Sequence, residues 1–167
     1  MFLYPKAGGE LPWPGGVNYL GPTPPYGGDI PRPSTEMTWW EIVCEKVNPE
    51  DVFYTPGSGK DGGKKQKPFF IISKDASKIS ILSGHSPIPL TKECFNIVEE
   101  ALMSKKYLWL RIAAIREKDA LENSADKLIK QGTGSYLARA NYVCALLEHY
   151  KLVKYAMKVR KKVIELP

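Results

Sequence analysis

The sequence predicts an α+β protein in which a small mixed sheet is combined with about three helices. The 167 residues are 43% hydrophobic, which is enough to bury a core and excludes wholesale disorder. Short runs of residues have the two-residue period of strands, and segments between them have the spacing of amphipathic helices. Residues 1–33 hold 8 Pro and 7 Gly and predict an extended N-terminal arm.

The arm over residues 1–33 differs from an ordinary linker because aromatic residues are interleaved with its prolines and glycines. These residues are Phe2, Tyr4, Trp13, Tyr19 and Tyr26. Disordered linkers are normally poor in aromatic residues, so we expect the arm to dock its rings on a surface. That surface belongs either to the chain's own core or to a partner, a second subunit included. Residues 34–167 are expected to form a single α+β domain.

Helical spacing and capping residues predict where the helices lie. A short amphipathic segment is predicted over residues 36–47, with Ser34 or Thr35 as its cap. It brings Trp39, Trp40, Val43 and Cys44 to one side. Three longer helices follow. The first starts at Thr91 and ends near Ser104, with Glu99 and Glu100 toward solvent. The second covers residues 120–131 and ends at Gly132, and the third covers residues 135–150.

Strand signals occupy the middle and the end of the domain. Residues 51–54 predict a short strand, and residues 68–73 and 78–82 predict a hairpin with a four-residue connection. Residues 83–89 are expected to form a loop that places Ile88 in the core. A strand is predicted over residues 108–115, and residues 152–166 are expected to close the chain as β structure.

The positive charge is concentrated near the end of the chain. Residues 1–50 have a net charge of −3 and residues 51–103 a net charge of +1, whereas residues 104–167 carry 14 positive and 6 negative residues. The net charge of +6 therefore comes from this last part. Such segregation points to a polyanionic partner.

The last β segment has a cationic pattern that depends on whether it bends. If residues 153–163 run as one ribbon, four cations share a face: Lys154, Lys158, Arg160 and Lys162. A hairpin break near residues 158–161 instead places the cations at its tip. The alternative without a ligand is an edge strand that lysines protect against aggregation.

The order of the C-terminal elements is helix, glycine-containing turn, helix and β ribbon, which is compatible with a winged helix-turn-helix. In that arrangement the helix over residues 135–150 reads the nucleic acid. Arg139 and Asn141 near its start are the residue types that contact phosphates and base edges.

The loop over residues 56–67 is rich in glycine and lysine but is not a Walker phosphate loop. That motif requires Gly at position 58 and Ser or Thr at position 65, and the chain has Ser58 and Lys65 there. Its four lysines, Lys60, Lys64, Lys65 and Lys67, are candidates for contacts to a phosphate backbone by charge alone. The alternative is a connecting loop with no ligand.

The sequence predicts no catalytic residue, metal ligand or cofactor, and it leaves open whether the protein is an enzyme. His85 is expected to bond to its local backbone, and the three cysteines behave as small core residues. Glu50 and Asp51 are the one carboxylate pair worth testing for a metal site.

We therefore predict a protein that binds nucleic acid, DNA rather than RNA, through a basic C-terminal surface and mainly by phosphate contacts. One alternative is an assembly subunit whose arm over residues 1–33 packs on a partner or on a second copy. The other alternative is a metal-dependent nuclease. The chain has no run of 18 apolar residues and no signal-peptide pattern, so we expect a cytoplasmic location and no contact with a membrane.

Overall fold

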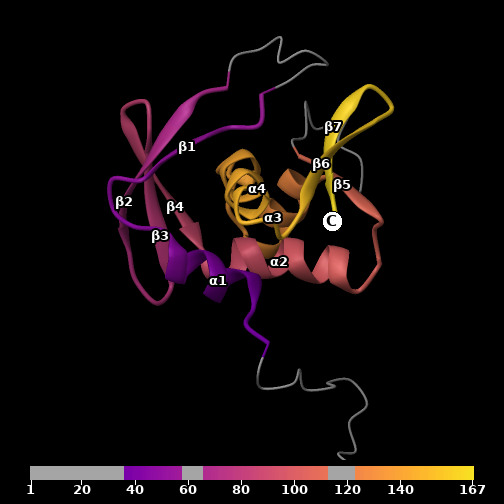
Figure 1. Ribbon diagram of the computed structural model, residues 1–167, viewed down its shortest axis with the longest axis horizontal. Helices are drawn as coiled ribbons and strands as arrows, with labels where there is room; N and C mark the ends of the chain where they lie inside the picture. Colours follow the sequence, from indigo (N-terminus) through magenta and orange to yellow (C-terminus); the bar gives the residue numbers. More distant parts are fainter. Residues whose placement is uncertain (1–35, 58–65, 113–122) are drawn as a thin grey trace, which may run out of the picture. The chain divides into compact units, whose positions relative to one another are not determined.

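The computed structural model describes residues 36–57, 66–112 and 123–167, and the arm predicted over residues 1–33 lies outside them. The described residues form an α+β fold with four helices and two small antiparallel sheets (Figure 1). The predicted class is confirmed, but the mixed sheet is wrong. Tight turns join most neighbouring strands, and such turns impose antiparallel pairing.

The first sheet contains the strands β1 (Val52–Tyr54), β2 (Pro68–Lys74), β3 (Lys78–Ser83) and β4 (Ser86–Thr91) in that spatial order. The predicted hairpin of β2 and β3 is confirmed. Its turn is held by the Asp75 carboxylate, which accepts hydrogen bonds from the backbone N–H groups of Ser77 and Lys78 and from the Ser77 hydroxyl. These bonds lower the pKa of Asp75.

The strand β4 corrects the loop predicted over residues 83–89. A two-residue turn, Gly84 and His85, joins β3 to β4, and Ser83 pairs with Ser86. Pro87 and Pro89 argued against a strand because proline lacks an N–H group. They are tolerated here because β4 is an edge strand, one side of which has no neighbour.

The helix α1 (Trp39–Lys46) begins later than predicted. Its N-cap is Thr38, and the Thr38 hydroxyl oxygen accepts a hydrogen bond from the Glu41 N–H at 3.2 Å. The predicted cap residues, Ser34 and Thr35, lie outside the described residues. Trp39, Trp40 and Val43 are buried, as predicted.

The helix α2 (Lys92–Met103) has the predicted start and end, but Glu99 does not face solvent. The Glu99 side chain is buried, and its Oε2 accepts a hydrogen bond from the Trp39 N–H at 3.1 Å. The carboxylate therefore lies at the N-terminus of α1, where the helix dipole favours negative charge.

The helices α3 (Ala125–Thr133) and α4 (Ala140–His149) differ from the prediction at the turn between them. Gly132 lies inside α3, where a Cβ atom would overlap the side chain of Ile97 on α2. Gly134 is the residue in the left-handed conformation that ends α3, with φ 68°. Residues 135–139 are not helical, so α4 begins five residues later than predicted.

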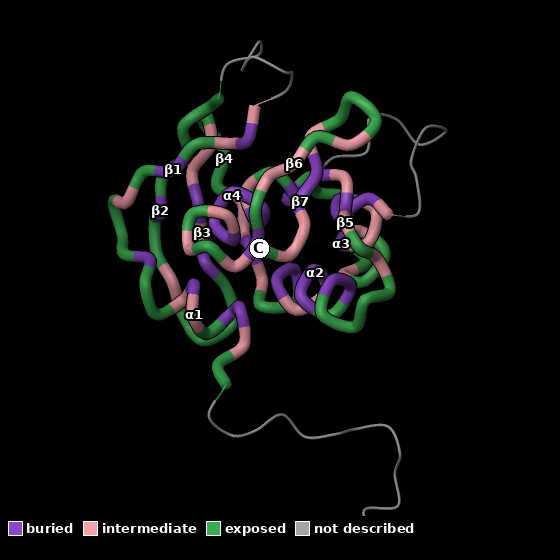
Figure 2. Tube along the Cα trace, turned by 45° about the vertical axis from the view of Figure 1, so that its right-hand side comes forward, coloured by how far each residue is buried: buried purple, intermediate pink, exposed green. Residues whose placement is uncertain are grey.

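The second sheet contains β5 (Trp109–Arg111), β6 (Lys154–Lys158) and β7 (Lys161–Glu165), in the spatial order β5-β7-β6. The helix α4 lies between the two sheets (Figure 1), and six of its ten residues are buried, most of them in its middle (Figure 2). Its apolar residues share one core with Phe69 of β2 and Ile164 of β7. None of the helices in the described ranges has the length and apolar character that a membrane span requires.

Candidate nucleic-acid interface

The cationic C-terminal segment bends into the hairpin of β6 and β7, so the single-ribbon alternative is wrong and the hairpin alternative is confirmed. Lys158 pairs with Lys161, and only Val159 and Arg160 lie between them. Both turn residues have positive φ angles, 49° and 60°, as a type I′ turn requires. The turn gathers cationic side chains within a few residues of the tip.

The bend also changes which cations share a face. Lys154 is opposite Glu165 and Lys158 is opposite Lys161, so these four side chains lie on one face of the hairpin. Lys162 is opposite Met157 on the other face, and Arg160 lies in the turn itself. The predicted common face of Lys154, Lys158, Arg160 and Lys162 is therefore not formed, because the turn interrupts the two-residue period.

One carboxylate neutralises part of the hairpin. Glu165 forms ion pairs with Lys154 at 3.6 Å and with Lys158 at 3.2 Å. Over the described ranges no carboxylate forms an ion pair with Arg160, Lys161 or Lys162. Among the described residues, the positive charge at the tip of the hairpin is therefore not compensated by an ion pair.

Lys162 connects the hairpin to the base of the glycine- and lysine-rich loop. Its Nζ donates a hydrogen bond to the carbonyl oxygen of Pro56 at 2.6 Å and lies 5.2 Å from the ring centre of Tyr155. Pro56 follows β1 at the start of the loop, and the Thr55 N–H donates to the carbonyl of Lys67, at the end of the loop, at 2.9 Å. Lys67 is exposed, and Lys60, Lys64 and Lys65 lie outside the described residues.

Arg139 does not belong to an exposed site. Its side chain is 3% exposed, and the guanidinium donates to the Thr133 hydroxyl at 2.7 Å and to the carbonyl of Pro89 at 3.4 Å. These contacts tie the end of α3 to the edge strand β4. The candidate base contact by Arg139 is therefore withdrawn, whereas Asn141 is exposed on the first turn of α4.

The first sheet covers the helix that was expected to read the nucleic acid. The Tyr142 hydroxyl of α4 donates to the Ser83 hydroxyl at 3.0 Å, and the Tyr142 ring packs edge-on against Phe69. At the other end of α4, the His149 ring packs edge-on against Phe53. These contacts cover the side of α4 that carries Tyr142 and His149, and Asn141 is the residue of its first turn that stays exposed.

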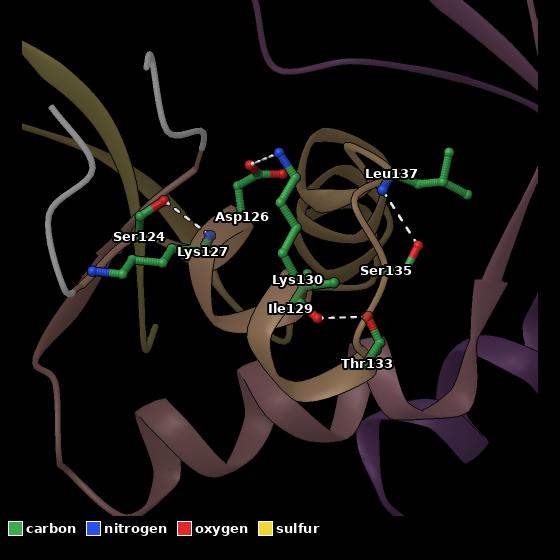
Figure 3. A network of polar contacts seen from close by, with 8 residues as sticks. All are labelled: Ser124, Asp126, Lys127, Ile129, Lys130, Thr133, Ser135 and Leu137. Carbon is green, nitrogen blue, oxygen red and sulfur yellow. Dashed lines mark hydrogen bonds and ion pairs between the residues drawn. The ribbon is translucent and has the colours of Figure 1, made fainter. Parts of the chain in front are cut away.

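Of the two lysines of α3, Lys130 has its side chain held within the helix, whereas Lys127 takes part through its backbone (Figure 3). Lys130 forms an ion pair with the buried Asp126 at 2.9 Å, and the Lys127 N–H donates to the Ser124 hydroxyl that caps the helix. The Thr133 hydroxyl donates to the carbonyl of Ile129. The ion pair compensates Lys130 locally, and its charge therefore adds little to the field at the hairpin.

Asp51 and Cys144, which were considered for metal binding, have roles within the fold. Asp51 Oδ2 accepts from the Asn48 N–H at 2.7 Å, and Cys144 is fully buried, which raises the pKa of its thiol. His85 lies in the β3–β4 turn. Within the described part of the chain, no three His, Cys, Asp or Glu side chains are grouped as metal ligands.

The predicted site residues omit Lys161, although the hairpin break predicted near residues 158–161 includes it. The signal that identifies it is the run from Lys158 to Lys162, in which a two-residue turn would place Lys161 directly across from Lys158. Comparisons of the chain with family models, curated proteins and solved structures returned no match.

Proposed function

We propose that the protein binds DNA through the β6–β7 hairpin, mainly by contacts between its cations and phosphates. The observation that carries the proposal is the tip of the hairpin, where Arg160 and Lys161 have no ion pair in the described part of the chain. Lysine and arginine side chains that are free of carboxylates release condensed counterions when they meet a phosphate backbone.

The pairing of Lys158 with Lys161 supports this proposal. Two like charges directly across an antiparallel pair destabilise a hairpin. Glu165 offsets the charge of Lys158 but forms no ion pair with Lys161. A bound phosphate would relieve the remaining repulsion, so the arrangement suits a protein that meets a polyanion.

The order of elements gives a second line of support. From α2 to β7 the described elements, with residues 113–122 left out, run helix, strand, helix, helix, strand, strand, and the strands are arranged β5-β7-β6. This order is compatible with a winged helix, in which the β6–β7 hairpin is the wing and α4 is the reading helix. Because α4 is covered by the first sheet, we assign DNA contact to the wing and not to the helix.

The test is charge reversal at the tip in the double variant Arg160→Glu/Lys161→Glu. Neither substitution removes a partner of the two Glu165 ion pairs or of the bond from Lys162 to Pro56. We expect affinity for a 20-base-pair duplex to fall at least about tenfold and the slope of log K against log salt to decrease by about 2. Fluorescence anisotropy at graded salt concentrations measures both quantities.

The matched control is Lys46→Glu/Lys92→Glu, which makes the same change in net charge at two exposed lysines of α1 and α2. Affinity should fall less than about threefold in this control. Equal losses in the two double variants would show that net charge alone drives binding. Absence of binding by the unaltered protein at low salt would overturn the proposed function.

A further inference from the structure

We propose that Val159 at the hairpin tip contacts base edges in the major groove of double-stranded DNA, with the thymine methyl group as its partner. This inference rests on the proposed function and adds to it the class of nucleic acid and an uncharged contact. The local backbone conformation of Val159 is unfavourable for a valine.

Val159 has a φ of 49°, in the left-handed region that β-branched residues avoid. The other described non-glycine residues with positive φ are unbranched at Cβ: Glu50, Lys105, Lys151 and Arg160. Asn and Gly are the residues that a type I′ turn favours at these two positions. Sequence and conformation therefore disagree at the tip, and such disagreement is typical of functional sites.

Packing within the chain does not explain Val159 either. Its side chain is 84% exposed, so burial does not offset the strain of the backbone. Next to it Met157 is 43% exposed, while Lys158, Arg160 and Lys161 surround the turn with positive charge. The tip therefore presents one apolar side chain beside three cationic ones. This combination suits a groove of nucleic acid, which is bordered by phosphates and has base edges at its floor.

The dimensions of the hairpin favour the major groove of DNA. Two paired strands lie about 4.8 Å apart before side chains are added, and the major groove, about 12 Å wide, admits a two-stranded ribbon. The minor groove is about 6 Å wide, so a ribbon with its side chains enters it only when the DNA is bent and the groove widened. The major groove of double-stranded RNA is deep and narrow and is closed to side chains. The hairpin therefore fits duplex DNA better than duplex RNA.

The chemistry of the groove identifies the partner of the valine. Base edges in the major groove present hydrogen-bond donors and acceptors and a single apolar group, the C5 methyl of thymine. A valine side chain cannot form hydrogen bonds, so this methyl is the group that it recognises. Lys158 and Lys161 flank the turn, where the phosphates border the groove.

The experiment compares an alternating dA-dT duplex with an alternating dA-dU duplex, which lacks only the methyl groups. We expect the unaltered protein to bind the thymine duplex about fourfold more tightly, the value of one buried methyl group. In Val159→Asn the preference should disappear, because the charges of the tip remain and the apolar contact is lost. Titrations at one fixed salt concentration measure both proteins on both duplexes.

Two controls separate this effect from damage to the fold. Asn tolerates the left-handed conformation, so the melting temperature of Val159→Asn should stay level or rise by about 3 °C. Val52→Asn changes another exposed valine, on the outer face of the first sheet, and should keep the preference for thymine.

The outcomes distinguish the inference from the proposed function. Equal affinity of the unaltered protein for both duplexes would overturn the inference, while sensitivity to Arg160→Glu/Lys161→Glu would still support binding through the hairpin. A thymine preference that persists in Val159→Asn would also overturn it, because another residue would then read the methyl. If neither duplex binds at low salt, the proposed function itself fails.

Discussion

The two sheets differ in the side chains that they expose, although both contribute residues to the same hydrophobic core. The outer face of the first sheet carries the apolar side chains of Val52, Tyr54, Phe70 and Ile72, each between 44 and 55% exposed. The β6–β7 hairpin of the second sheet exposes Arg160 and Lys161, and its only described carboxylate is Glu165. Alternation along a strand decides which residues turn outward, but it does not decide their polarity.

This difference shows that the overall positive charge of the protein does not say which part of its surface carries unpaired cations. The net charge is +6, but Lys130 and Lys158 are paired with carboxylates. The attraction for phosphate is therefore expected at the hairpin and not across the first sheet. Stability should depend on buried residues of either sheet, whereas binding should depend on the tip of one.

The largest effect is expected inside the first sheet, between two neighbouring phenylalanines. Phe69 is completely buried against Phe53 and Tyr142, whereas Phe70 is 44% exposed. We expect Phe69→Ala to lower the free energy of unfolding by about 3–5 kcal/mol and Phe70→Ala by less than about 1 kcal/mol. Urea unfolding measures both values. Similar losses would indicate that the outer face is covered in solution.

A smaller effect is expected at the bond from Lys162 Nζ of β7 to the carbonyl of Pro56, in the loop that follows β1 of the first sheet. Lys162→Met removes this charged donor and the cation above the Tyr155 ring, and should lower stability by about 1–2 kcal/mol. Lys161→Met removes the same charge from an exposed side chain and should change stability by less than about 0.5 kcal/mol. If chemical denaturation gives equal values, Lys162 does not connect the sheets.

The smallest effect concerns the pH dependence of stability, through Tyr155 on the core side of β6. Burial, and then the nearby Cys144 and Glu148, raise the pKa of Tyr155. Below about pH 10 the phenol is neutral in both states. Above about pH 10, Tyr155 ionises in the unfolded chain but stays neutral in the folded chain. The free energy of unfolding that comes from Tyr155 therefore decreases as pH rises.

The measurement is the melting temperature between about pH 8 and pH 11, compared with that of Tyr155→Phe. The variant should lose stability less steeply above about pH 10, and identical slopes would contradict the role of Tyr155.

Elements governed by neighbouring residues could be predicted from the sequence. The β2–β3 hairpin follows from alternating apolar residues around a turn that Asp75 stabilises, and α2 starts at Thr91 as expected. The strand β4 was missed because Pro87 and Pro89 oppose a strand unless it lies at an edge. Its position at the edge is a property of the sheet and not of the segment.

Residues whose role depends on a distant partner could not be predicted. Gly132 looked like a helix end, but it allows α3 to approach Ile97 of α2. Arg139 looked like a base-reading side chain, but it is buried between Thr133 and Pro89. A polar side chain near a helix start has the same local signature whether it faces solvent or a neighbouring strand.

The sequence alone determined the α+β class and the concentration of cations near the C-terminus, because local periodicity and charge are properties of short segments. Tertiary structure decided which cations stay uncompensated, since Glu165 reaches Lys154 and Lys158 across the hairpin. It also joined Lys162 to Pro56, 106 positions away, and buried α4 beneath the first sheet. Such contacts depend on how separate elements pack, and no short segment of the chain contains that information.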